Sequence, residues 1–335
     1  MDSHVASGHD RKVWLLALVP DIRFGRWLSA LVLFTLLYGA FRASRVFEES
    51  DEPGQAAALF FCIIIAYIVP VYHLITTHTV AAFSELEPEL TAPPELVQGW
   101  RNRIAHKPPL WTWSTLGFGV AAGLLHNVLL AGSPTVLMHR LATNLPASAL
   151  VFGALLVWIV MMFVVVALID NARLFNRLSM HTTVDLIDPG RLTAFARVAV
   201  ASTLALIGAQ AAFPVLWVSP DSSVVAMVPG LLATGTPMFF LLALPIWPIH
   251  RAIATAKANE LRRINERLRS MPRVGDQTAD FASLNQLLSY RREIAAVSEW
   301  PFNTSVATRL AFYLVIPPLT WIAAGLIDVM IERLV

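Results

Sequence analysis

The chain has 335 residues, of which 56% are hydrophobic and 14% are charged, and its formal net charge is +2. A soluble domain carries roughly 25% charged residues, so this composition excludes an ordinary soluble protein and favours a chain buried largely in lipid. The small positive charge does not indicate a nucleic acid as a partner. The single cysteine, Cys62, excludes a framework of disulfide bonds within the chain.

Seven long runs without a charged residue follow one another along the chain. A transmembrane helix needs about 20 apolar residues. Six runs satisfy this requirement, and the first does so only if it includes Phe24 and Gly25. The sequence therefore predicts an all-α polytopic membrane protein with seven transmembrane helices, the first six of them within residues 27–249. The runs are 27–41, 53–84, 108–138, 141–169, 198–220, 222–249 and 310–327.

The distribution of Lys and Arg predicts how these helices are oriented. If the N-terminal segment, residues 1–26, is cytoplasmic, then 21 of the 25 Lys and Arg residues lie on the cytoplasmic side. Such an excess marks the inner side of a membrane. We therefore expect the N-terminus inside and the C-terminus outside, with the first span acting as an uncleaved signal anchor.

Histidines in the second and third spans are the first candidates for chemistry. His73 and His78 lie near the inner end of the second span, and His126 lies in the third. A metal hydrolase would need three His and an Asp at one depth, whereas these histidines differ in depth and spacing. We interpret His73 and His78 as residues at the lipid headgroups, and His126 as hydrogen-bonded between helices. Since no nucleotide, hydrolase or zinc motif occurs, we expect no enzyme, catalytic residue, metal or cofactor.

The fourth span has no Gly or Pro from Ala154 to Met180. At 1.5 Å per residue this is about 40 Å, longer than the roughly 30 Å hydrocarbon core. We therefore expect the fourth and fifth helices to extend into the cytoplasm. Asp170, at the inner end of the fourth span, lies three residues before Arg173, so the two side chains can pair locally. A functional role is the default for an ionisable group inside a membrane, and a structural pair is the alternative.

The sixth span contains four prolines, and its continuation predicts an amphipathic cytoplasmic helix. A polar break follows, after which Asp280 can cap a second amphipathic helix that reaches Trp300. Residues 250–300 are therefore predicted to form a cytoplasmic helical anchor region. This region either joins copies of the chain or lies on an anionic lipid surface.

The seventh span, in residues 301–335, contains Pro317 and Pro318. Because proline has no N–H group, the carbonyls of Tyr313 and Leu314 lose their helical partners. Within a membrane, such carbonyls require cover from protein or a water-filled cavity. One interpretation is therefore a helix that lines a pore, and the other is a simple packing kink.

Two acidic residues, Asp328 and Glu332, lie one turn apart at the outer end of this span. In an oligomer with the helix at its axis they would form rings, a common device for selecting cations. In the alternative interpretation they are ordinary interfacial groups. In the pore hypothesis, Thr320 and the Tyr313 carbonyl form a polar wall, and Leu314 or Ile316 forms the gate. Asp328 and Glu332 form an acidic outer mouth. The eight candidate pore residues are Tyr313, Leu314, Ile316, Pro317, Pro318, Thr320, Asp328 and Glu332.

Two resemblances concern the chain as a whole. The segments "EWPFNTSVATRLAFYLVIPPLTW" and "HTTVDLIDPGRLTAFAR" resemble a family of uncharacterised bacterial seven-span proteins, which implies the bacterial inner membrane as the location. More remotely, the topology resembles the seven-transmembrane ion channel superfamily that includes insect odorant and gustatory receptors. That resemblance implies a tetramer joined by a cytoplasmic anchor domain, with the seventh helix lining the pore.

The leading hypothesis is thus an oligomeric, tetrameric, cation-permeable channel. Its partners would be the lipid bilayer, other copies of the chain, inorganic cations and a possible small-molecule ligand, without nucleic acid. One alternative is a secondary transporter or small-molecule-binding membrane protein whose pathway lies inside one chain, near the proline-broken sixth span and His126. Another is a membrane scaffold whose cytoplasmic helices bind a partner.

Overall fold

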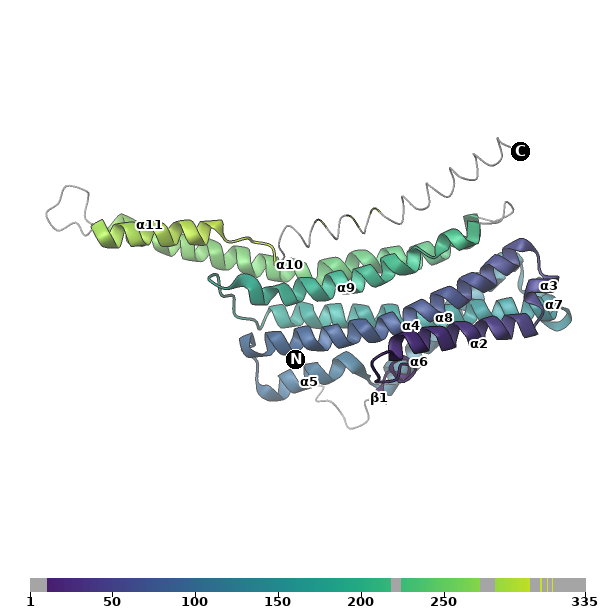
Figure 1. The fold of residues 1–335 in the computed structure, drawn as a ribbon. Coiled ribbons are helices and arrows are strands. Elements are labelled where there is room, and N and C mark those ends of the chain that lie inside the picture. The colour runs from purple at the N-terminus through teal and green to yellow at the C-terminus, as the bar shows by residue number, and fades with distance from the viewer. Residues whose placement is uncertain are drawn as a thin grey trace, which may run out of the picture.

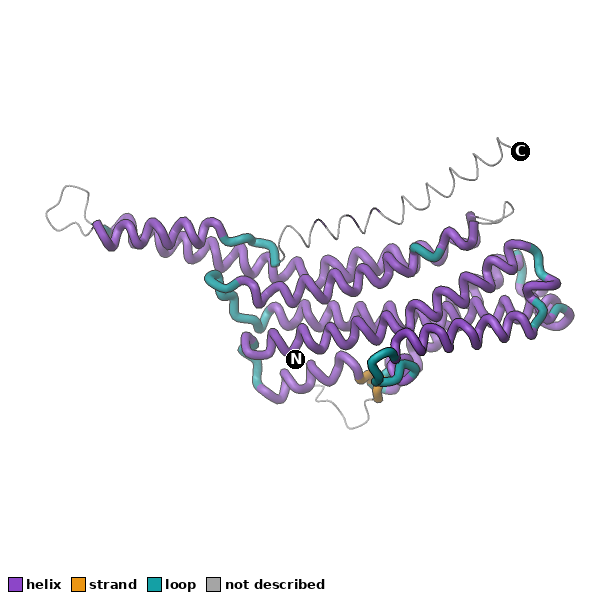
Figure 2. Tube along the Cα trace, viewed as in Figure 1, coloured by secondary structure: helices purple, strands orange, loops and turns teal. Residues whose placement is uncertain are grey.

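The computed structural model describes residues 11–217, 224–271 and 281–301, together with Thr308, Phe312 and Val315. The described chain is all-α apart from one antiparallel pair of two-residue strands, β1 (Arg11–Lys12) and β2 (His106–Lys107). Figure 1 shows the long helices lying alongside one another as a bundle. Figure 2 shows that short loops connect them, with the strand pair at one side.

Five stretches of helix in the described part of the chain are long and apolar enough to cross a membrane. This finding confirms the prediction of an all-α, multi-pass membrane protein. The stretches are built on α4 (Glu52–Leu86), α6 (Pro109–Ala131), α8 (Leu145–Ser179), α9 (Thr193–Gln210) and α10 (Val224–Ser270).

The predicted first span corresponds to α2 (Gly25–Ala43), which has 19 residues and carries Arg26 and Arg42 near its two ends. It is not among the five apolar stretches. Most of the seventh predicted span, including all eight candidate pore residues, lies outside the described residues. Seven spans and an inside N-terminus therefore stay predictions.

The centre of the bundle is formed by α4, α8 and α9, which bury about half of their apolar stretches. Side-chain caps fix where the two longest of these helices begin. The carboxylate of Asp51 accepts a hydrogen bond from the Gly54 N–H at 3.0 Å, and the Asn144 amide oxygen accepts one from the Ala147 N–H at 2.9 Å. Such caps satisfy N–H groups that have no partner within the helix. As predicted, α8 continues without a break past Asp170, to Ser179.

The expectation of a proline-broken sixth span is wrong, because α10 is one continuous helix of 47 residues. Pro229, Pro237, Pro245 and Pro248 all lie inside it. Each proline removes one helical hydrogen bond, but transmembrane helices tolerate this loss where neighbouring helices and local adjustments satisfy the freed carbonyls. In this bundle α10 packs along α8 and α9.

Beyond the bundle, α11 (Phe281–Ala296) packs against the end of α10, and the two form a hairpin that projects past α8 and α9 (Figure 1). Both predicted amphipathic helices are therefore present, although the second ends at Ala296 and not at Trp300. The remaining short elements connect the bundle. They are α1 (Trp14–Ala17), α3 (Val46–Glu49), η1 (Glu87–Glu89), α5 (Pro94–Ala105), α7 (Pro134–Thr143), η2 (Pro189–Leu192) and η3 (Phe213–Trp217).

Candidate functional site

A cavity of about 120 Å³ lies between α4, α6, α8 and η3, within the apolar part of the bundle. We call it the His126 cavity, because His126 is the only titratable group among the described residues that line it. All its other walls are aliphatic or aromatic. The lining residues are Ala57, Phe60, Phe61, Ile64, His126, Leu130, Ala154, Val157, Trp158, Met161, Phe213 and Leu216.

The ring of His126 is held against the ring of Trp158, with centroids 5.7 Å apart and planes inclined by 52°. Its Nδ1 atom is buried and has no hydrogen-bond partner among the described residues. The expected hydrogen bond between helices is therefore not made through this atom. A buried polar atom without a partner costs about 1–3 kcal/mol, which a bound polar group can recover.

The position of His126 depends on the close approach of α6 to α8. A Cβ atom added at Gly119 would lie 2.8 Å from the Ile159 Cα, so only glycine fits there without a shift. Next to His126, the Asn127 amide nitrogen donates to the carbonyls of Gly123 at 2.8 Å and Val151 at 3.4 Å. Small residues commonly bring transmembrane helices together, and polar residues such as this asparagine link them.

The size and chemistry of the His126 cavity define what it can hold. An engineered apolar cavity of about 150 Å³ in another protein binds benzene, so this one suits a ligand of about one small ring. An imidazole Nδ1 either donates or accepts, depending on the tautomer. A hydroxyl or carbonyl on the ligand would match it. Leu130 at the cavity wall is 48% exposed, so the cavity reaches the outer surface of the bundle, where lipid chains would lie.

The histidines of the second predicted span do not join this cavity. The Nε2 atom of His73 lies 3.6 Å from the Asp21 carboxylate, whereas His78 is exposed. Among the described residues, no group of three or more His, Cys, Asp or Glu side chains is placed to hold a metal ion.

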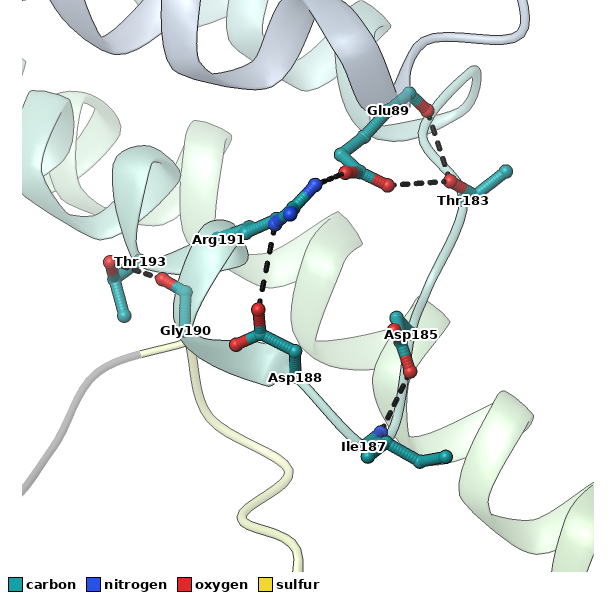
Figure 3. Close-up of polar contacts among 8 residues, drawn as sticks. All are labelled: Glu89, Thr183, Asp185, Ile187, Asp188, Gly190, Arg191 and Thr193. Atoms are coloured by element: carbon teal, nitrogen blue, oxygen red, sulfur yellow. Dashed lines mark hydrogen bonds and ion pairs between the residues drawn. The ribbon is translucent and has the colours of Figure 1, made fainter.

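Acidic residues in the last turn of α4 and in η1 hold the connection between α8 and α9, as Figure 3 shows for Glu89. The Glu89 carboxylate accepts hydrogen bonds from Arg191 and, at 3.2 Å, from the Thr183 hydroxyl. Arg191 also lies 3.5 Å from the Asp188 carboxylate. Glu85 pairs with Arg197 in the same way. Every one of these carboxylates has a cationic partner, so we interpret the segment "DLIDPGRLTAFAR" as a structural connection between helices.

Asp170 pairs with Arg173 at 3.9 Å, as its spacing predicts, and also with Lys107 at 3.5 Å. Lys107 was not among the residues predicted from the sequence. The segment "HKPPLW" at the start of the third span, in which a lysine directly precedes an apolar run, was the available signal. The partner could not be identified, because Lys107 in β2 and Asp170 in α8 lie far apart in the sequence.

Comparison of the chain with models of known protein families, with curated proteins and with solved structures finds no significant match. By its fold, the protein belongs to the class of all-α, multi-pass membrane proteins. The function of this protein therefore has to be inferred from its own residues and cavities.

Proposed function

We propose that this protein is a membrane protein that binds a small, mostly apolar molecule inside one chain, in the His126 cavity. The observation that carries the proposal is that His126 lines an otherwise apolar cavity while its buried Nδ1 atom has no hydrogen-bond partner among the described residues. Natural ligand sites combine apolar walls with a few polar groups that orient the ligand. An alcohol or carbonyl compound with one small ring fits this combination.

Benzyl alcohol and toluene provide matched probes, because they share a ring and differ by one hydroxyl group. Thermal unfolding of the detergent-solubilised full-length protein would be followed with increasing concentrations of each probe. A ligand that binds only the folded state raises the midpoint of unfolding. We expect benzyl alcohol to raise it more than toluene, and His126→Phe to abolish the difference between the two probes.

A cavity-filling variant separates binding from partition into the detergent. Ala154 is buried at the cavity wall, and Ala121 lies exposed on α6, so Ala154→Phe fills the cavity whereas Ala121→Phe leaves it open. The proposal requires that Ala154→Phe loses the response to both probes and that Ala121→Phe retains it. An equal response in the two variants would show that the probes act elsewhere.

A second candidate, the oligomeric cation-permeable channel, is favoured by the α10–α11 hairpin. This hairpin projects beyond the bundle, where it is accessible to other copies of the chain (Figure 1). Two contacts bring the chain after α11 back to α10. The Lys257 ammonium donates to the Val297 carbonyl at 2.8 Å, and His250 Nδ1 lies 2.9 Å from the Glu299 carbonyl. The hairpin would thus join subunits next to the start of the proposed pore segment.

Native mass spectrometry tests this second candidate through the number of subunits. A tetramer or another closed ring would support it, and single-channel recording of Asp328→Asn and Glu332→Gln variants would follow. Reduced cation selectivity in these variants is the expected result. A monomer in detergent and in lipid nanodiscs would remove the shared pore and leave binding in the His126 cavity unaffected.

A further inference from the structure

A second cavity, of about 240 Å³, lies at the opposite end of α6 from His126. It is formed where α5, β2 and the first turn of α6 meet the last turns of α8. Four of its lining residues have basic side chains: Arg103, Lys107, Arg173 and Arg177. We call it the basic pocket.

The basic pocket lies where apolar helix gives way to charged helix. The charge-free part of α6 begins after Lys107, and that of α8 ends at Ile169. These are the two places where the chain would cross from hydrocarbon to the headgroup layer of a membrane. Basic pockets between transmembrane helices at this level can bind anionic headgroups.

The charges in the pocket are unbalanced. Asp170 is the only carboxylate among its described lining residues, and it pairs with both Lys107 and Arg173. Arg103 and Arg177 add two further positive charges that this carboxylate does not neutralise. Lys107 is 5% exposed, and burial lowers the pKa of its ammonium group even though Asp170 acts in the opposite direction. An added anion would therefore stabilise the charged residues that are already present.

Two buried hydrogen-bonding side chains also line the pocket without a partner among the described residues. Both amide atoms of Asn171, a residue only 1% exposed, are unpaired, and so is the indole Nε1 of Trp111. The indole N–H is a donor only, and the amide NH₂ supplies two more donor hydrogens. Water alone could satisfy these groups, but it would not balance the positive charge.

We propose that the basic pocket binds a phosphate group. Its oxygens would accept hydrogen bonds from Asn171 and Trp111 and pair with Arg103 and Arg177. The phosphate belongs either to an anionic lipid headgroup or to a soluble phosphate compound. This site is separate from the His126 cavity, and the proposal does not depend on the proposed function.

Three probes distinguish these sources. Dioctanoyl phosphatidylglycerol offers an anionic phosphate on short chains, dioctanoylglycerol has the same chains without phosphate, and inorganic phosphate has no chains. Each is titrated into the purified full-length protein while the midpoint of thermal unfolding is measured, because a ligand of the folded state raises that midpoint. Native mass spectrometry then counts the bound molecules.

The double variant Arg103→Gln/Arg177→Gln removes two charges from the pocket and leaves the Lys107–Asp170 pair intact. A matched control, Arg262→Gln/Arg267→Gln, removes the same charge from exposed positions on the projecting part of α10. Because each arginine would donate charge-assisted hydrogen bonds to the phosphate, the pocket variant should bind phosphate at least about tenfold more weakly. The control should bind as the unaltered protein does.

If phosphatidylglycerol alone raises the midpoint of unfolding, and the pocket variant loses this effect, the result supports the site and identifies a lipid headgroup as the source of the phosphate. If both phosphate-bearing probes raise the midpoint of unfolding, and the pocket variant again loses the effect, the result supports the site and identifies a soluble phosphate as a ligand. The proposal is overturned if neither phosphate-bearing probe binds. It is also overturned if dioctanoylglycerol binds equally well, or if the pocket variant and the control respond alike.

Discussion

Trp300 stacks on His250, with ring centroids 4.1 Å apart and planes inclined by only 13°. This contact joins the chain that leaves α11 to the middle of α10. It lies beside the hydrogen bond between His250 Nδ1 and the Glu299 carbonyl. The stack therefore fixes where the α10–α11 hairpin ends and the C-terminal segment begins.

Trp300→Ala should loosen this end of the hairpin. Because a paired aromatic contact contributes about 0.5–1.5 kcal/mol, amide hydrogen exchange in residues 281–301 should become roughly twofold to tenfold faster. Trp300→Phe retains an aromatic ring and serves as the control, with exchange close to that of the unaltered protein. Unchanged exchange in Trp300→Ala would show that other contacts hold the hairpin.

Gly119→Ala should destabilise the fold, because the new methyl group would meet the backbone of α8 at Ile159. Forcing an extra carbon into a packed contact costs about 1–3 kcal/mol. Gly117, on the same helix, has nothing within 4 Å of an added Cβ atom. Gly117→Ala should therefore leave the free energy of unfolding unchanged or slightly raised. Equal effects of the two substitutions would contradict the close packing of α6 on α8.

Lys107 and Asp170 should show strong energetic coupling. Removing one partner of a buried ion pair costs about 3–5 kcal/mol, whereas replacing both with apolar residues often costs little. We therefore expect Lys107→Met and Asp170→Leu each to lower the free energy of unfolding, and the double variant to be more stable than either. Additive losses in a denaturation experiment would show that the two side chains do not depend on each other.

The pH dependence of stability gives a separate test of Lys107. Burial lowers the pKa of its ammonium group in the folded state below the ordinary lysine value of 10.5. The unfolded chain then binds the proton more tightly, so this residue's contribution to the free energy of unfolding rises as pH increases toward that value. Compared with Lys107→Met, the unaltered protein should gain stability as the pH rises toward the ordinary lysine pKa of 10.5. A parallel pH dependence of the two proteins would contradict the shift.

The sequence predicted those features that depend on local pattern. Apolar run length located the five helical stretches that are long and apolar enough to cross a membrane. The absence of Gly and Pro from Ala154 to Met180 predicted the long continuation of α8. The three-residue spacing of Asp170 and Arg173 predicted their pairing. In each case the residues concerned are neighbours on one helix, so spacing alone fixes their relative position.

Features that depend on packing between helices could not be predicted in this way. The His126 cavity requires the close approach of α6 to α8, and the basic pocket requires Lys107 to lie next to α8. The four prolines suggested a break in α10, yet the helix is continuous and packs along α8 and α9. A pattern on one helix does not reveal the neighbouring helices that support it. The candidate pore residues, from Tyr313 to Glu332, lie outside the described chain, and their role stays a prediction.

The central claim, binding of a small ring compound in the His126 cavity, is tested most directly by fluorine NMR. The ligand 4-fluorobenzyl alcohol would be titrated into the full-length protein and into Ala154→Phe, with Ala121→Phe as the control. We expect a saturable shift of the fluorine resonance that unlabelled benzyl alcohol reverses and that Ala154→Phe abolishes. The same shift in all three proteins, without saturation, would show that the ligand only partitions into detergent and that the His126 cavity does not bind it.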